Sequence, residues 1–138
     1  MMKGACLAIV ASLLAAPSAA QQTIVGSWSG SVLEMQADGQ PQVYPIRMLI
    51  DANGTGTIEY PTLACGGRLT PLGTPGELRE FRETLTYGID KCVDNGTVGV
   101  LPRAGKLIWY WTGEETSQPD SVASAVLRPS PTKAGTRP

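Results

Sequence analysis

Apolar and polar side chains alternate along most of this chain with a period of two residues. Such a period is typical of β-strands that bury one face. The clearest stretches are "TIVGSWSGSVLEM", "VYPIRMLI", "TIEY", "LREFRETLTYG", "KLIWYW" and "SVASAVLRP". The residues expected to point into a core are Ile24, Trp28, Val32, Tyr44, Ile46, Met48, Ile50, Ile58, Tyr60, Phe81, Leu85, Tyr87, Trp109, Ala123, Ala125 and Leu127. In the first stretch, the serines and Glu34 are assigned to the intervening positions.

Short turn signals separate these stretches. "ANGTG" and "DNGT" each contain Asn-Gly, which favours the positive φ angles of a tight hairpin, and "PRAG" and "PLGTPGE" are further breaks. Seven or eight short strands joined by brief turns predict an all-β fold, an antiparallel up-and-down barrel. A two-sheet sandwich is the alternative. Within "GELREFRETL" a helix is the alternative to a strand, although Thr84 and Thr86 favour the strand.

The first twenty residues have the layout of a secretory signal peptide. Lys3 precedes an apolar run over residues 5–16, and small residues at 18–20 predict cleavage after Ala20. The run is too short to span a bilayer, and no other segment is long and apolar enough to do so. We therefore expect a secreted or periplasmic protein with a barrel domain over 21–129 and a disordered, Pro-rich tail over 130–138.

Charge and composition exclude several classes of function. The net charge is −1, and removing Lys3 with the signal peptide makes it −2, which gives no field for gripping nucleic acid. Without histidine there is no Ser-His-Asp triad and no histidine metal site. Glu80 and Glu83 differ in parity, one being an even and the other an odd position along the strand. On a regular strand their side chains therefore lie on opposite faces and cannot act as paired acids. The sequence predicts no enzyme, no cofactor and no metal.

Two cysteines remain after the signal peptide, which takes Cys6 with it. Cys65 and Cys92 lack the CxxC spacing of a redox pair, and zinc usually needs four Cys or His ligands. In an oxidising compartment they predict a disulfide that closes a loop and stabilises the fold. Asp90, Asp94 and Asn95 lie beside Cys92 and offer oxygen ligands for calcium, but Asp-Asn-Gly is ordinary turn chemistry.

The segment "GSWSG" resembles the Gly-x-Trp start of the first strand in lipocalins, avidins and related calycin barrels. The Thr-Asp-Tyr stretch and the terminal arginine motif of lipocalins have no counterpart in this chain. A longer pattern runs through "GSWSG", "IEYPTLACGG", "FRETLTYGIDKCVDNGTV", "LIWYW" and "ASAVLRP". It is similar to a small domain of exported bacterial proteins with a Cys-Gly-Gly and Cys-Val-Asp pair. This resemblance implies a calycin-like barrel and carries no settled activity.

Glu83 is the most unusual of the candidate site residues. It shares parity with Phe81 and Leu85, so a regular strand points it inward, where a carboxylate is costly unless paired or protonated. It could hold a ligand amine or act as a general acid. The structural alternatives are an ion pair with Arg47 or Arg68, or a β-bulge that turns Glu83 outward.

Two functions remain open from the sequence. The first is a non-enzymatic binding module that recognises another envelope or secreted protein, for example as an inhibitor, through polar loops such as "EMQADGQPQ" and "TGEETSQPD". The alternative is a carrier of a small apolar ligand in the barrel. Its expected lining is Trp28, Tyr60, Phe81, Glu83 and Trp109. An empty pocket around Glu83 would favour the carrier, and a packed interior would favour surface recognition.

Overall fold

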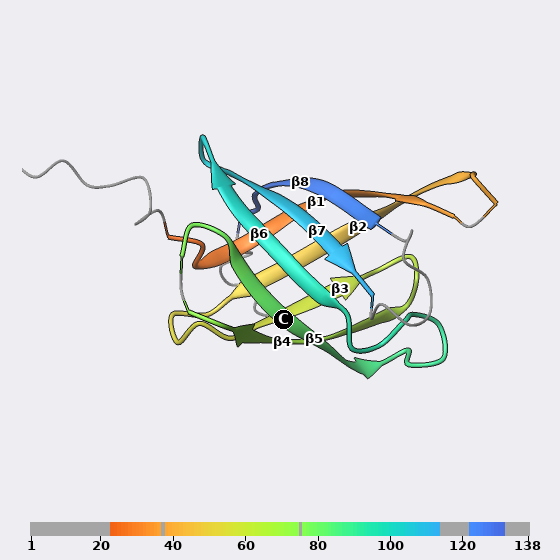
Figure 1. Cartoon of the computed structure of the whole chain (residues 1–138), viewed down its shortest axis with the longest axis horizontal. Coiled ribbons are helices and arrows are strands. Elements are labelled where there is room, and N and C mark those ends of the chain that lie inside the picture. Colours follow the sequence, from red (N-terminus) through yellow and green to blue (C-terminus); the bar gives the residue numbers. More distant parts are fainter. Residues whose placement is uncertain (1–22, 37, 75, 114–121, 132–138) are drawn as a thin grey trace, which may run out of the picture.

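The computed structural model describes residues 23–36, 38–74, 76–113 and 122–131, and these form a closed antiparallel barrel (Figure 1). The strands are β1 (Gly26–Met35), β2 (Pro41–Ile50), β3 (Gly56–Tyr60), β4 (Cys65–Leu72), β5 (Arg79–Tyr87), β6 (Thr97–Arg103), β7 (Lys106–Thr112) and β8 (Val122–Pro129). Each strand pairs with its neighbour in sequence, and β8 returns to pair with β1. The predicted up-and-down barrel is confirmed with eight strands, and the sandwich alternative is wrong.

The core of the barrel is built from the alternating residues. Fifteen of the sixteen residues expected to point inward are buried, and Cys65, Leu69, Val98, Val100 and Leu107 complete the core. The segment that could have been a helix is β5, as the alternation favoured. The described part of the chain contains no helix that is long and apolar enough to cross a membrane.

Tyr87 is the exception, and its predicted inward orientation is wrong. The register shifts between β4 and β5, because Gly66 pairs with Tyr87 whereas Gly67 pairs with Leu85. Thr86 is therefore an extra residue of a β-bulge, and a bulge reverses the face on which the following side chain lies. Tyr87 is 48% exposed, and its ring covers Gly66, where a Cβ would collide with the phenol oxygen.

The predicted turns are present with differing backbone geometry. In the β2–β3 turn only Gly54 of the Asn-Gly pair has a positive φ, +88°. The β6–β7 turn places Ala104 and Gly105 at φ 50° and 78°, as a two-residue hairpin requires. The second Asn-Gly belongs to the longer β5–β6 connection, where Asn95 has φ 59°.

The two ends of the predicted domain are only partly covered by the structure. The predicted signal peptide, residues 1–20, lies outside the described residues, as do residues 132–138 of the predicted tail. The first tail residue, Ser130, donates its backbone N–H to the Ser27 carbonyl at 2.9 Å. This bond continues the pairing of Trp28 with Pro129 between β1 and β8.

Candidate functional site

A pocket of about 580 Å³ opens at the end of the barrel where β1, β3 and β7 end. Its inner wall is formed by Glu34, Tyr44, Tyr60, Glu83, Trp109 and Trp111. Lys91, Cys92 and Val93 of the β5–β6 connection line it as well, and Lys91 and Val93 are exposed. We call this cavity the mouth pocket.

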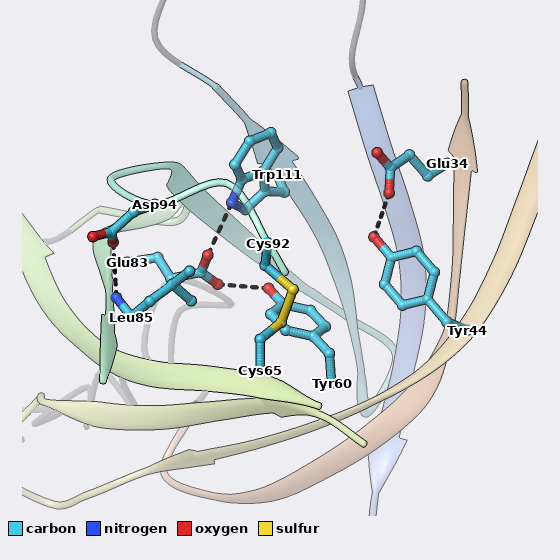
Figure 2. The surroundings of a disulfide bond; sticks show 9 residues. All are labelled: Glu34, Tyr44, Tyr60, Cys65, Glu83, Leu85, Cys92, Asp94 and Trp111. Atoms are coloured by element: carbon cyan, nitrogen blue, oxygen red, sulfur yellow. Dashed lines mark hydrogen bonds between the residues drawn. A yellow bond between two sulfur atoms is a disulfide. The ribbon is translucent and has the colours of Figure 1, made fainter. Parts of the chain in front are cut away.

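Glu83 is buried in the wall of the mouth pocket with 1% of its surface exposed. The Tyr60 hydroxyl donates to Oε2 at 2.6 Å, and the Trp111 indole Nε1–H donates to Oε1 at 3.2 Å (Figure 2). Each carboxylate oxygen thus accepts one hydrogen bond from an aromatic side chain. The inward orientation follows from strand parity, but the expected ion pair with Arg47 or Arg68 is wrong: Arg47 pairs with Glu59 at 3.7 Å, and Arg68 is exposed on β4.

The surroundings of Glu83 perturb three acidic groups. Burial raises the pKa of Glu83; the donors Tyr60 and Trp111 partly offset this, and the charge of Asp94 adds to it. Burial, followed by the nearby Glu83 carboxylate, raises the pKa of Tyr60 well above its usual value. Burial and the Glu34 carboxylate raise the pKa of Tyr44 in the same way. Both tyrosines are therefore neutral phenols that donate hydrogen bonds to carboxyl groups.

Glu83→Gln should change how stability depends on pH. The pKa of Glu83 is higher in the folded protein than its ordinary value of 4.5. Its contribution to the free energy of unfolding is therefore fully present below pH 4.5 and is lost as the pH rises through the folded pKa. As the pH rises from the unfolded pKa to the folded pKa, the wild type should therefore lose up to about 1.4 kcal/mol of stability per pH unit relative to Glu83→Gln. Urea unfolding of both proteins over this range measures the difference. Parallel curves would mean that Glu83 titrates normally.

Glu34 forms the second carboxyl of the mouth pocket. The Tyr44 hydroxyl donates to its Oε2 at 2.7 Å (Figure 2). Its assignment to the intervening positions is wrong, because 34 has the same parity as 24, 28 and 32, and Glu34 is half-buried. β1 therefore contributes a carboxyl group to the pocket directly above Val32 of the core.

Aromatic rings connect the two carboxyl groups. The rings of Tyr44 and Tyr60 meet edge to face with centroids 5.9 Å apart, and those of Tyr60 and Trp109 with centroids 6.5 Å apart. The Trp109 ring is 1% exposed. Its Nε1–H is a buried side-chain donor with no partner among the described residues. An ordered water or a bound acceptor would satisfy such a group.

The predicted disulfide joins Cys65 and Cys92, with their Cα atoms 6.3 Å apart (Figure 2). It ties the β5–β6 connection, which lines the mouth pocket, to the first residue of β4. Asp94 supports the same connection, since its Oδ1 accepts from the backbone N–H groups of Leu85 and Asn95, both at 2.8 Å. The bridge is consistent with an oxidising location outside the cytoplasm.

Gly96 makes room for Trp111 beside Glu83. A Cβ on Gly96 would collide with the Trp111 indole, and the Gly96 carbonyl accepts from the Glu83 backbone N–H at 2.9 Å. A Cβ on Gly99 would likewise collide with the Tyr110 ring, which lies on the outer face. Two glycines of one strand region thus seat two aromatic rings on opposite faces of the barrel wall.

The structure brings together only part of the expected lining. Tyr60, Glu83 and Trp109 meet in the mouth pocket, whereas Phe81 lines a separate cavity of about 450 Å³ at the opposite end. Trp28 lines neither cavity, and its indole N–H donates to the Ile24 carbonyl at 2.8 Å. Glu34, Tyr44, Trp111 and Lys91 were not in the expected lining. Parity pointed to the first three, but parity does not give the height of a side chain along the barrel.

Chemically, the mouth pocket offers aromatic faces, hydrogen-bond acceptors and negative charge. Across residues 23–36, 38–74, 76–113 and 122–131, no cluster of three or more Cys, Asp or Glu side chains is arranged to hold a metal ion. Comparisons with known protein-family models, with curated proteins and with solved structures found no match for this chain.

Proposed function

We propose that this protein is a non-enzymatic carrier that binds a small organic molecule in the mouth pocket. The observation that carries the proposal is the open cavity of about 580 Å³ beside Glu83. Pockets for small ligands generally have volumes of about 300–1,000 Å³. Such sites combine apolar and aromatic side chains with placed polar groups, and the mouth pocket combines four aromatic rings with the polar side chains of Glu34, Gln36, Gln42, Glu83 and Lys91.

The wall is well suited to binding because the fold holds it in place. Tyr60 and Glu83 lie on strands, and their hydrogen bond fixes both side chains before a ligand arrives. The disulfide restrains the connection that carries Lys91, Cys92 and Val93. A preorganised site loses less conformational entropy on binding, which favours affinity.

Carriage outside the cytoplasm is part of the proposal. It is supported by the signal-like first twenty residues and by the Cys65–Cys92 bridge, which persists in oxidising compartments. The proposed ligand differs in one respect from the small apolar molecule that the sequence suggested. A wholly apolar molecule would face two carboxyl groups, so the ligand should carry polar groups as well.

The three tryptophans allow a direct test with small-molecule fragments. In ¹⁵N–¹H spectra of the disulfide-bonded protein, fragments that bind the mouth pocket should shift the indole N–H signals of Trp109 and Trp111 saturably. The Trp28 indole, bonded to Ile24 away from the pocket, is the internal control. If no fragment of a broad library shifts the Trp111 signal, or if Trp28 shifts equally, the proposed carrier function is wrong.

A matched pair of variants locates the binding. Gly96→Ala should displace Trp111 into new positions and weaken fragment binding, because its Cβ needs the space of the indole. Gly99→Ala makes the same collision with Tyr110 on the outer face and should leave fragment binding unchanged. Equal effects on binding would show that the fragments do not occupy the mouth pocket.

Recognition of another exported protein is the second proposed function. It is favoured by exposed apolar side chains that face each other across neighbouring strands: Ile108 opposite Val126, and Leu33 opposite Val43. Exposed apolar groups that lie together are typical of protein contact sites. The wild-type protein should bind its partner protein saturably, and the double variant Val43→Lys/Ile108→Lys should not bind it. Retention by both proteins would contradict recognition through this face.

A further inference from the structure

The charge in the mouth pocket is predominantly negative. Glu34 and Glu83 lie in its wall, and Asp94 lies close enough to raise the pKa of Glu83 by its charge. Lys91 is the one cationic side chain that lines the pocket among the described residues, and it is exposed at the edge. No arginine of the described part lines the mouth pocket; Arg47 pairs with Glu59, and Arg82 donates to the Asn95 carbonyl. A positively charged ligand would therefore meet attraction from the wall, and an anion would meet repulsion.

The aromatic lining favours the same sign of charge. The faces of tyrosine and tryptophan rings attract cations within about 6 Å of the ring centroid, and the attraction strengthens when water is excluded. Tyr60 and Tyr44 each donate a hydroxyl hydrogen to a carboxyl oxygen, at 2.6 Å and 2.7 Å. A phenol that donates to a carboxylate gains electron density at its oxygen and ring, because hydrogen bonds of this kind polarise the donor. The donating tyrosines are thus better partners for a cation than free ones.

From the proposed carrier function, on which this step rests, we infer that the ligand is an organic cation. Its ammonium group would lie against the rings of Tyr44 and Tyr60, between the carboxyl groups of Glu34 and Glu83. Such a ligand supplies the counter-charge that Glu83 lacks within the protein. A neutral ligand of the same shape would cover the carboxyl groups without compensating the lost hydration, which is unfavourable.

Binding of a cation should also be coupled to a proton on Glu83. A positive charge nearby favours the ionised carboxylate and opposes the effect of burial, so a bound cation lowers the pKa that burial has raised. The groups that act directly on Glu83 are Tyr60, Trp111 and Asp94, and the other titratable groups of the pocket are Tyr44, Glu34 and Lys91. By linkage, cation affinity should rise with pH until Glu83 is fully ionised in the free protein.

The test compares choline with 3,3-dimethylbutan-1-ol, its neutral isostere, in which carbon replaces the charged nitrogen. Isothermal titration and the Trp111 indole signal measure both affinities on the disulfide-bonded protein. Choline should bind at least about tenfold more tightly than the alcohol. Glu83→Gln should remove most of that preference by weakening choline binding, whereas the alcohol, which then covers one charged carboxyl group fewer, should bind at least as tightly as before. Lys91→Gln should strengthen choline binding.

Two further variants make the test decisive. Glu80→Gln is the control, because Glu80 is exposed on the outer face near Tyr110, and it should change neither affinity. Glu34→Gln is the second test variant and should reduce the preference for choline even if Glu83→Gln fails to fold. Choline binding that neither Glu34→Gln nor Glu83→Gln weakens would overturn the inference.

The outcomes separate this inference from the proposed function. If both compounds shift the Trp111 signal with equal affinity, the mouth pocket binds small molecules but does not select cations, and the inference is wrong. If choline and the alcohol both fail while neutral fragments bind, the carrier function stands and the inference is again wrong. If no compound of either kind binds, the carrier function fails together with it.

Discussion

Cys65→Ser is expected to lower the free energy of unfolding by about 3.5 kcal/mol, the loop entropy that the disulfide removes from the unfolded chain. The two cysteines are 27 residues apart in sequence, so the reduced unfolded chain regains the freedom of a loop of that length. Urea unfolding at equilibrium measures the change. A loss of this size is a large fraction of the stability of a domain of this length, which is generally about 5–15 kcal/mol.

The partner variants serve as controls for this prediction. Cys92→Ser should destabilise by the same amount as Cys65→Ser, and the double variant should be no less stable than either single one. Clearly unequal single effects, or a double variant that loses twice as much, would mean that the two thiols act separately. Because Cys92 lines the mouth pocket, the variants should also weaken fragment binding.

Gly67→Ala should be among the most damaging single methyl additions, lowering the free energy of unfolding by about 3 kcal/mol or more. The new Cβ would collide with the Thr84 carbonyl oxygen and with the Leu85 Cα atom at 2.7 Å. Both obstacles are backbone atoms of β5 beside the bulge, so the barrel wall must move for the methyl group to fit. Thermal or urea unfolding measures the loss.

Gly76→Ala is the matched control for Gly67→Ala. A Cβ at Gly76 meets no atom within 4 Å, and its φ lies outside the positive range. The substitution should leave stability within about 0.5 kcal/mol of the wild type. If Gly67→Ala were as mild as Gly76→Ala, the close approach of β4 and β5 at the bulge would be wrong.

The fold could be predicted from the sequence because strand alternation is a local property. Tyr44, Ile46, Met48 and Ile50 face one side whatever their neighbours are, and the same reasoning places Glu83 inside. Tyr87 escaped the prediction because a bulge depends on how two strands align rather than on the residues of one strand.

The candidate site was less predictable because it depends on contacts between distant strands. Tyr60 lies 23 residues before Glu83, and Trp111 lies 28 residues after it, so only the barrel register shows that they meet. The position of a side chain along the barrel axis could not be predicted from the alternation either. Phe81 and Glu83 are two residues apart on the same face of β5, yet they line cavities at opposite ends. Parity determines on which face of the sheet a side chain lies, and the register of all eight strands determines at which end of the barrel it lies.

The pairing of Trp28 with Pro129 places the beginning of β1 and the last residues of β8 side by side, at the end of the barrel away from Trp111. Thr23 and Pro131, where the described part of the chain begins and ends, therefore lie toward the end of the barrel opposite the mouth pocket. A tether joined directly to either of these two residues would lie on the side away from the mouth pocket, so the same scaffold could be displayed on a surface without obstructing access to its interior.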